Sequence, residues 1–291
     1  MKRVLITGGT GFVGGHLVRR FCDIGWKVSI LSRRLREGSD RQDVDFLKYD
    51  GTVGSVISAL ESFAPDVVVH LASLYIAEHS AAQVDSLVAG NILFGAQLAE
   101  AMSLRKVHLL VNAGTAWQNY KNSAYDPVNL YAATKQALED ILAYYRNAHR
   151  LRIITLKLFD TYGPGDKRPK LLAALRRSRN ERMSFSQGRQ RIDLVHIDDV
   201  VDAFVLAAER LLRGRVKSAE TYAVSSGRPL TLRRIAAIYE QTVGCKLKID
   251  WGARPYRTRE VMAPWSKGRR LPGWNPKIAL EKGLIDLEGI R

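Results

Sequence analysis

Tyr131 and Lys135 are residues whose types and spacing suit acid–base chemistry. They lie four positions apart in the segment YAATK, so a helix would place the phenol and the amine on one face. A tyrosine with its ordinary pKa of about 10 is a poor proton carrier at neutral pH. A neighbouring ammonium favours the phenolate and lowers that pKa. The pair therefore predicts proton transfer to or from a substrate oxygen, provided that the rest of the chain supports it.

A glycine-rich segment near the N-terminus supplies such support. Residues 7–14 read TGGTGFVG, between an apolar run expected as a strand (3–7) and a run with helical spacing (16–24). Glycines at this junction permit a tight turn and let the backbone approach a pyrophosphate, which then faces the N-terminus of the helix. An oxidised nicotinamide bound there would lower the pKa of Tyr131 further. The residues expected to contact this dinucleotide are Gly8, Thr10, Gly11, Phe12 and Val13.

The end of the second expected strand, residues 27–31, indicates which dinucleotide binds. An acidic residue at this place holds the ribose hydroxyls of NAD, whereas a cation suits the 2′-phosphate of NADP. Here the chain continues Ser32-Arg33-Arg34, and an arginine can bind a phosphate bidentately. We therefore expect NADPH as the cofactor, although two solvated loop charges would give the same residues. Asp50, followed by Gly51, ends the next strand-like stretch and is placed to meet the adenine amino group.

Short apolar runs alternate with helical segments through the first half of the chain. Strands are expected at residues 67–71, 106–111 and 151–159, and helices at 84–102 and 131–145. Strands this apolar are buried on both faces, as in a parallel sheet covered by helices. The predicted fold class is α/β, with a doubly wound parallel sheet of the Rossmann type.

The pattern is looser after the glycine–proline turn at residues 163–165. It predicts a helix at 170–179, a strand at 191–196 and helices at 198–213, 231–243 and 279–283, with Thr231 as a helix cap. No repeat or linker-like segment separates the two parts. We expect a dinucleotide-binding domain over residues 1–165 and a smaller α/β substrate lobe over residues 166–291, with the chain crossing back to the sheet.

The charge of the chain is uneven. The 45 Lys and Arg against 29 Asp and Glu give a net charge of +16. Residues 1–145 hold 14 basic and 14 acidic side chains, whereas residues 146–291 hold 31 basic and 15 acidic ones. A field of this size favours an anionic partner, and nucleic acid, an anionic membrane surface and a diphosphate-bearing substrate all fit. An arginine-rich surface without a partner fits as well.

Cysteine usage and the N-terminus bear on the compartment. Cys22 and Cys245 lie far apart and lack metal-ligand spacing, which is typical of thiols in a reducing, cytoplasmic protein. The start MKRVLIT runs into a strand and a turn and does not resemble a signal peptide. The sequence contains no stretch of about 18 uncharged apolar residues, so it predicts no membrane-spanning helix. We expect no metal site and no membrane insertion.

The motifs together resemble the extended short-chain dehydrogenases/reductases that act on nucleotide sugars as epimerases, dehydratases and reductases. The likeness covers nearly the whole chain and includes HLAS at 70–73, YGPGD at 162–166 and GWNP at 273–276. NAGTAWQ at 112–118, PVNLY at 127–131 and FDTYG at 159–163 resemble, more narrowly, the CDP-abequose and CDP-paratose synthases. Members of that group are NADPH-dependent reductases of 4-keto-6-deoxy sugars.

The resemblance implies a catalytic set around the pair described first. Thr115 would bond the substrate carbonyl oxygen beside Tyr131, and Lys135 would tune Tyr131 and hold the nicotinamide ribose. The 4,6-dehydratases carry an Asp-Glu pair just after this hydroxyl, and Ala116-Trp117 stands there instead, which disfavours dehydration. The further cofactor contacts that the resemblance implies come from Leu71, Ala72, Ser73, Asn91 and Asn112.

Substrate contacts are also implied by the resemblance. Asp160 takes the place where many relatives have an asparagine on the substrate phosphate, so we expect it to bond a sugar hydroxyl or a backbone group. Arg254 matches a phosphate-binding arginine. Arg189 or Arg191 could reach the phosphate through their loop. Surface solvation is the alternative for each of the three arginines.

The activity implied is NADPH-dependent reduction of a nucleotide-linked 4-keto-6-deoxy sugar, a step toward surface polysaccharide such as the O-antigen of lipopolysaccharide. The alternative is an NAD-dependent nucleotide-sugar 4-epimerase. A regulatory NADP-sensing or nucleic-acid-binding protein would explain the charge but not the set of Thr115, Tyr131 and Lys135. The apolar helices 84–102 and 131–145 suit either the homodimer interface of this family or a well-covered core.

Overall fold

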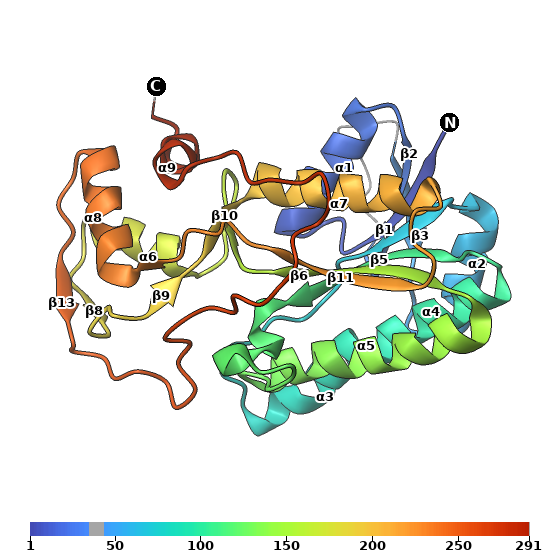
Figure 1. Cartoon of the computed structure of the whole chain (residues 1–291), viewed down its shortest axis with the longest axis horizontal. Coiled ribbons are helices and arrows are strands. Elements are labelled where there is room, and N and C mark those ends of the chain that lie inside the picture. The colour runs from blue at the N-terminus through green and yellow to red at the C-terminus, as the bar shows by residue number, and fades with distance from the viewer. Residues whose placement is uncertain (35–43, 291) are drawn as a thin grey trace.

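One parallel sheet forms the larger part of the molecule (Figure 1). The computed structural model describes residues 1–34 and 44–290. Within these residues seven strands lie in the order β11-β6-β5-β4-β1-β2-β3, and every pairing between them is parallel. The doubly wound α/β fold predicted from the sequence is confirmed. The strands are β1 (Arg3–Thr7), β2 (Lys27–Ser32), β3 (Val44–Lys48), β4 (Val67–His70), β5 (Leu109–Thr115), β6 (Arg152–Leu158) and β11 (Ala219–Val224).

Helices cover both faces of this sheet, which explains why its strands are apolar on both sides. Along β1, Val4 and Ile6 belong to one buried cluster and Leu5 to the other. The first cluster includes α1 (Phe12–Asp23) and α7 (Ile197–Leu212). The second includes α2 (Val53–Phe63), α4 (Phe94–Leu104) and α5 (Leu130–His149). Figure 1 shows these two helix layers above and below the sheet.

The helix predicted at residues 84–102 is interrupted. It consists of α3 (Val84–Val88), a π-helical turn at Ala89–Leu93, and α4, and a 3₁₀ turn at Ala81–Gln83 precedes it. The extra residue in the π turn rotates Asn91 into the protein interior, where it is 1% exposed. Periodicity alone did not reveal this turn, because its five residues are apolar or small apart from Asn91.

The same segment, Ala81–Leu104, is long and apolar enough to cross a membrane by length and composition, with a mean hydropathy of 1.3. In this structure it is a layer of the fold: Leu98 and Met102 are buried against the sheet, and α4 packs on α5. Part of its apolar surface is therefore used inside the protein, while Val88, Leu93 and Leu104 are exposed.

The rest of the chain forms a smaller group of short elements, at the left in Figure 1. It has its own apolar cluster around Leu175, Phe185 and Tyr239. The strands pair as β7 (Asp160–Tyr162) with β10 (Leu194–His196), β8 (Met183–Phe185) with β13 (Ile249–Trp251), and β9 (Arg191–Ile192) with β12 (Leu230–Thr231). The helices are α6 (Leu171–Arg177), α8 (Leu232–Val243) and α9 (Leu280–Glu288).

Several predicted boundaries change. The strand expected at 191–196 is divided into β9 and β10 at Asp193, whose carboxylate accepts hydrogen bonds from Ser225 and Ser226. The strand expected at 106–111 starts later and runs to Thr115. The last helix is longer than residues 279–283. The cap at Thr231 is confirmed, since its hydroxyl accepts from the Arg234 N–H at 3.2 Å.

Candidate active site

The glycine-rich loop lies where β1 passes into α1, at the edge of the sheet where the strand order reverses. Gly8 has a φ of +72°, and a Cβ there would lie 2.6 Å from the Ala72 nitrogen. A Cβ on Gly14 would collide with the Gly8 carbonyl oxygen. Gly11 is the N-cap of α1 and, having no side chain, makes no side-chain cap bond to the first N–H groups of the helix. A backbone cradle with unsatisfied donors at a helix N-terminus fits a pyrophosphate. Of the predicted contacts, Thr10 is exposed and Phe12 and Val13 are half-buried in this loop.

The loop after β4 lies against this cradle. The Thr7 hydroxyl bonds His70 Nδ1 at 2.8 Å and accepts from the Ala72 N–H at 3.2 Å. The Leu71 N–H donates to the Thr7 carbonyl oxygen at 3.1 Å. Burial lowers the pKa of His70 to about 3, so this histidine is neutral and helps to hold the loop through Thr7. Leu71, Ala72 and Ser73 are thus held beside Gly8.

Asn91 supports that loop. Its side-chain oxygen accepts from the Ser73 hydroxyl and the Leu74 N–H, and its nitrogen donates to the Leu74 carbonyl and the Thr134 hydroxyl. The amide is saturated by these four bonds. In this structure Asn91 supports the loop after β4, and a direct cofactor contact from it stays a prediction.

The residues expected around the adenosine lie at the same edge of the sheet. Arg33 and Arg34 follow β2 and are exposed, and the Ser32 hydroxyl accepts from the Arg34 N–H at 3.3 Å. Asp50 accepts from the hydroxyl and the N–H of Thr52, which hold its pKa below the ordinary value. The Gly51 carbonyl accepts from the Gln97 amide at 3.0 Å. The carboxylate of Asp50 is exposed beyond these bonds.

Tyr131 and Lys135 lie in the first two turns of α5. Asn129 caps this helix by accepting from the Ala132 N–H at 3.0 Å. Lys135 is 2% exposed, and burial lowers its pKa to about 8. Burial raises the pKa of Tyr131 to about 12, and a hydrogen bond with Ser73 opposes that rise. The net lowering of the Tyr131 pKa that the sequence suggested is not found, because desolvation of the phenolate outweighs the opposing effects of Ser73 and Arg168.

Thr115 is the last residue of β5 and is buried. Its hydroxyl oxygen accepts from the Trp117 N–H at 3.3 Å, which leaves the hydroxyl hydrogen to be donated elsewhere. Its own N–H donates to the Gln118 side-chain oxygen at 2.9 Å. Three residues earlier, Asn112 is fully buried within the sheet, and its amide nitrogen lies 3.4 Å from the Thr155 hydroxyl on β6.

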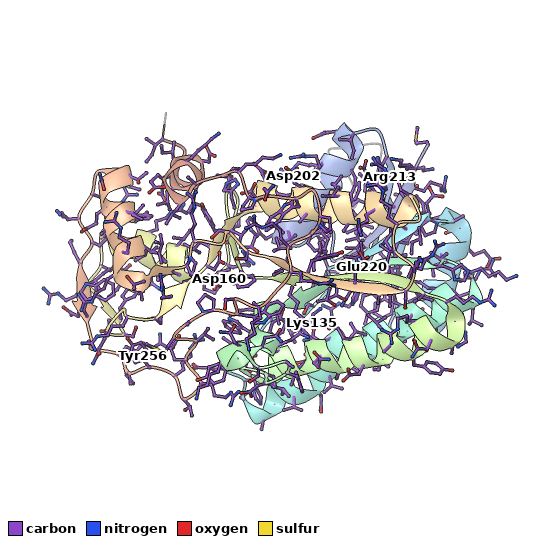
Figure 2. The ribbon with its side chains drawn as sticks, in the orientation of Figure 1. Lys135, Asp160, Asp202, Arg213, Glu220 and Tyr256 are labelled. Atoms are coloured by element: carbon purple, nitrogen blue, oxygen red, sulfur yellow. The ribbon has the colours of Figure 1, made fainter. Side chains whose placement is uncertain are left out.

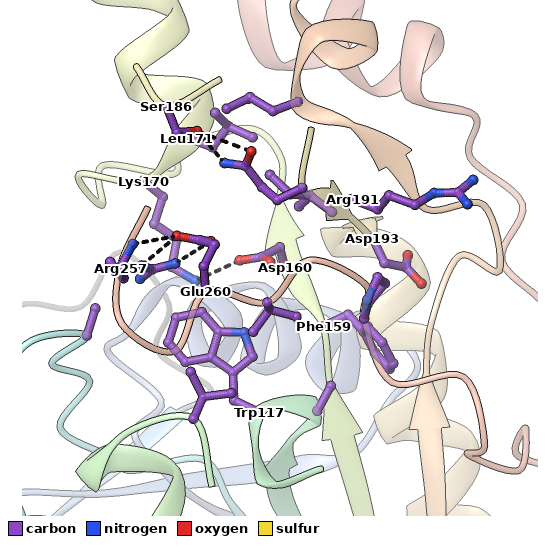
Figure 3. Close-up of a pocket in the computed structure, with 18 of the residues that line it drawn as sticks. Trp117, Phe159, Asp160, Lys170, Leu171, Ser186, Arg191, Asp193, Arg257 and Glu260 are labelled. Carbon is purple, nitrogen blue, oxygen red and sulfur yellow. Dashed lines mark hydrogen bonds and ion pairs between the residues drawn. The ribbon is translucent and has the colours of Figure 1, made fainter. Parts of the chain in front are cut away.

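A cavity of about 430 Å³ opens between the sheet edge and the smaller group of elements (Figure 3). Figure 2 shows Lys135 and Asp160 in the middle of the molecule, where the two parts meet. Burial raises the pKa of Asp160, and the Lys170 ammonium, 3.9 Å away, opposes this. Among the cavity-lining side chains are those of Tyr75, Trp117, Phe159, Asp160, Lys170, Phe185, Arg191, Arg254, Arg257, Glu260 and Trp265.

The three predicted substrate arginines are placed differently. Arg254 is exposed and lines the cavity. Arg191 also lines it, but its guanidinium donates to the Pro229 carbonyl at 3.2 Å, and Figure 3 shows it pointing away from Asp160. Arg189 does not line the cavity, because its loop turns it to the exterior, where its N–H donates to the Tyr256 hydroxyl. The structure does not bring Arg189 to this cavity, and its substrate contact stays a prediction.

Sequence reasoning missed the aromatic and cationic wall of the cavity. The Tyr75 ring lies 5.1 Å from the Tyr131 ring and 5.8 Å from the Trp117 ring. The Arg257 guanidinium lies 5.6 Å from the Trp117 ring centroid and pairs with Glu260. Trp117 and Trp265 both line the cavity. No spacing rule joins these residues, because they come from distant segments.

The chain matches a known family over most of its length. Residues 4–224 match the family described as NAD dependent epimerase/dehydratase. The chain belongs to this family. It is thus an enzyme of the extended short-chain dehydrogenase/reductase type, a class that uses a nicotinamide dinucleotide, and the residues of its glycine-rich loop fit such a group.

Individual relatives are distant but collinear. CDP-abequose synthase of Salmonella typhimurium is 24% identical over 293 residues, covering 98% of this chain and 96% of that protein. UDP-glucose 4-epimerase of Mycolicibacterium smegmatis is 27% identical over 308 residues, covering 97% and 96%. Among solved structures, UDP-glucose 4-epimerase of Brucella ovis in complex with NAD superposes with a TM-score of 0.86 at 20% identity, covering 99% and 98%. That likeness concerns the fold.

Proposed function

We propose that this enzyme reduces the keto group of a 4-keto-6-deoxy sugar linked to a nucleoside diphosphate, with NADPH as the reductant. The substrate class is supported by relatives whose names contain nucleotide sugars. The observation that carries the choice of NADPH is the end of β2, where Arg33 and Arg34 are exposed beside the glycine-rich loop. Two cations at this place suit a 2′-phosphate better than ribose hydroxyls.

The residues around Tyr131 then have separate tasks. When bound, the reduced nicotinamide supplies a hydride to the carbonyl carbon. Tyr131 donates its proton to the carbonyl oxygen, so that a C–H and an O–H bond form as the C=O double bond is lost. The raised pKa of Tyr131 keeps the phenol protonated before this step. The Thr115 hydroxyl has its hydrogen available for the same oxygen, and the Lys135 ammonium stabilises the phenolate that remains.

The cavity suits the substrate in size and charge. Its volume of about 430 Å³ is within the range of about 300–1,000 Å³ that small-molecule sites occupy. Arg254 provides an exposed cation for the diphosphate at one side. Asp160 lies nearer the catalytic edge and is the acceptor for a sugar hydroxyl. The diphosphate of the substrate would thereby pair with part of the positive charge of residues 146–291.

The same proposal covers the division of the chain, its oligomeric state and its location. Residues 1–165 act chiefly on the cofactor and residues 166–291 on the substrate, although β11 and α7 return to the sheet. Three exposed apolar residues suit a homodimer interface: Val88 on α3, Leu93 in the π-helical turn and Tyr144 on α5. A cytoplasmic location and a step toward surface polysaccharide accord with a nucleotide-sugar substrate.

A 4-epimerase is the second candidate. It is favoured by the relative from Mycolicibacterium smegmatis, whose match to this chain is as extensive as that of the CDP-abequose synthases. The same tyrosine, lysine and threonine would serve an epimerase, which oxidises and reduces one carbon with no net change in redox state.

One assay separates the two candidates. The protein is incubated with NADPH and a panel of nucleotide-linked 4-keto-6-deoxy sugars, and the near-ultraviolet absorbance of the reduced nicotinamide is followed. We expect stoichiometric loss of this absorbance with at least one 4-keto sugar. Conversion of UDP-glucose to UDP-galactose with NAD, together with no oxidation of NADPH by any member of the panel, would contradict the reductase proposal.

A further inference from the structure

A buried polar cluster lies directly behind Thr115 and Lys135. Glu139 is one helical turn beyond Lys135 on α5, and its carboxylate accepts a hydrogen bond from the Gln118 amide at 2.8 Å. Gln118 is fully buried, and its side-chain oxygen accepts from the Thr115 N–H at 2.9 Å. The amide of Gln118 also donates to the Gln136 side-chain oxygen at 2.8 Å. One chain of hydrogen bonds therefore links the Glu139 carboxylate to the backbone of Thr115.

Two buried lysines act electrostatically on the same carboxylate. Lys135 is 2% exposed and Lys157 on β6 is 5% exposed, and Lys157 donates to the Asn119 side chain at 2.9 Å. Both lysines favour the ionised form of Glu139, which is opposed by burial. Gly114 makes room for the group, because a Cβ there would lie 3.0 Å from Gln118 Oε1 and 3.1 Å from Glu139 Oε1. Position 114 thus has no room for a side chain beside the Glu139 carboxylate.

We propose that Glu139 is a positioning residue of the reaction, which fixes Thr115 through Gln118 and keeps Lys135 protonated. The inference rests on the proposed function, since it assigns Thr115 and Lys135 their tasks. Glu139 touches neither substrate nor cofactor in this scheme. It positions Thr115 and maintains the positive charge of Lys135.

The other charged groups near Lys135 do not replace this carboxylate. His70 on β4 is neutral near physiological pH and disfavours the ammonium when it is charged. Tyr131 on α5 holds its proton. On the neighbouring α4, Glu100 accepts from the Tyr145 hydroxyl, more than two helical turns from Lys135 along α5. Asp140 is exposed, and its carboxylate accepts from the Gln136 amide.

The direction of the pH effect follows from these charges. Burial alone lowers the pKa of Lys135, and the Glu139 carboxylate raises it. Removing that carboxylate leaves burial unopposed, so the lysine loses its proton at a lower pH. Any property that depends on the ammonium should then decline at a lower pH than in the wild type.

The test compares Glu139→Gln with Asp140→Asn, its matched control one residue away on the same helix. NADPH affinity is measured by fluorescence across the alkaline range, and kcat is measured over the same range. For Glu139→Gln we expect the midpoint of the alkaline decline to move down by about one pH unit, the lower end of what a lost counter-charge produces. Asp140→Asn should keep the wild-type midpoint. A Glu139→Gln curve that superimposes on the wild type, or an equal shift in Asp140→Asn, overturns the inference.

Two further variants protect the test against misfolding and separate the two roles. Glu139→Asp keeps the charge but shortens the reach to Gln118, so it should lower kcat while the pH midpoint stays. If Glu139→Gln does not fold, the double variant Glu139→Gln with Lys157→Met removes the ammonium that would be left unpaired, and the same downward shift is expected. An unshifted midpoint in that double variant overturns the inference.

Failure of the proposed function is distinguishable, because NADPH binding needs no sugar. A wild type that binds NADPH but reduces no 4-keto sugar refutes the function, while a shifted binding midpoint in Glu139→Gln still supports the coupling of Glu139 to Lys135. A wild type that reduces the sugar, together with an unshifted midpoint, refutes the coupling alone.

Discussion

The cofactor edge and the substrate cavity of this enzyme are built from different materials. At the cofactor edge, the loop at residues 7–14 is made of backbone and glycines, and it follows a strand whose residues Val4, Leu5 and Ile6 are fully buried. In the cavity, the wall is made of long side chains such as Trp117, Lys170 and Arg257, which come from three distant segments. A site made of backbone depends on local sequence, whereas a site made of side chains depends on how remote segments pack.

The two regions also manage charge differently. At the catalytic edge, burial shifts the pKa of Tyr131 upward and that of Lys135 downward, so the phenol keeps its proton and the lysine loses its proton at a lower pH than an exposed lysine does. In the cavity, the Arg257 guanidinium pairs with the Glu260 carboxylate, which raises the pKa of the arginine. The first region is suited to moving a proton and the second to holding an anion.

The largest effect is expected at the catalytic edge. Tyr131→Phe removes the proton donor and should lower kcat by about 10²–10⁴, the usual contribution of a positioned acid. NADPH affinity should stay nearly unchanged, since the glycine-rich loop is untouched. Steady-state kinetics and calorimetry measure the two quantities. Tyr144→Phe, an exposed tyrosine on the same helix, is the control, and near-native turnover of Tyr131→Phe would mean that another group supplies the proton.

At the adenosine end, Arg33→Ala should weaken NADPH binding by roughly 10–100-fold, the loss of a charge-assisted hydrogen bond to a phosphate. NADH affinity should not change, because NADH lacks that phosphate. Calorimetric titration of both dinucleotides provides the measurement and its internal control. Equal wild-type affinities for NADPH and NADH would be incompatible with a 2′-phosphate site at this place.

Two adjacent glycines test whether the cradle is set by close backbone packing. Gly14→Ala places a methyl group against the Gly8 carbonyl and should lower the free energy of unfolding by about 1–3 kcal/mol, with loss of NADPH affinity. The methyl group of Gly15→Ala would meet only the Gly9 oxygen, at 3.9 Å. This variant should raise the free energy of unfolding by about 0.5–1 kcal/mol, because alanine favours a helix interior. Denaturant unfolding distinguishes them. Equal effects from both variants would show that the cradle tolerates a side chain.

The smallest effect is expected in the cavity. Arg254→Ala should raise KM for the nucleotide sugar by about tenfold, the lower end for a charge-assisted contact, and leave NADPH affinity unchanged. Arg189→Ala is the control, since this arginine lies outside the cavity. Substrate binding should weaken only modestly with salt, as few phosphates are involved.

A different result would reassign the basic half of the chain. If Arg254→Ala leaves KM unchanged, and the protein binds random RNA or DNA with an affinity that falls steeply with salt, many phosphates are being contacted. Nucleic acid would then be the anionic partner of residues 146–291.

The sequence by itself determined the sheet, the glycine-rich loop and the spacing of Tyr131 and Lys135, because each depends on residues close together in the chain. Strand periodicity, a turn that only glycine permits and a four-residue helical repeat are local properties. The family resemblance added Thr115 to this set. The sheet, the loop and the pair were therefore predictable from residues that are close together in the sequence.

Only the tertiary structure decided the cavity wall, the pKa of Tyr131 and the partners of Asn91. Trp117 faces a cavity because the segments that carry Lys170 and Arg257 fold over it, and no local pattern contains that contact. The phenol of Tyr131 keeps its proton because the whole assembly excludes water, and desolvation acts through three-dimensional packing. Asn91 serves the loop after β4 because a π turn rotates it there.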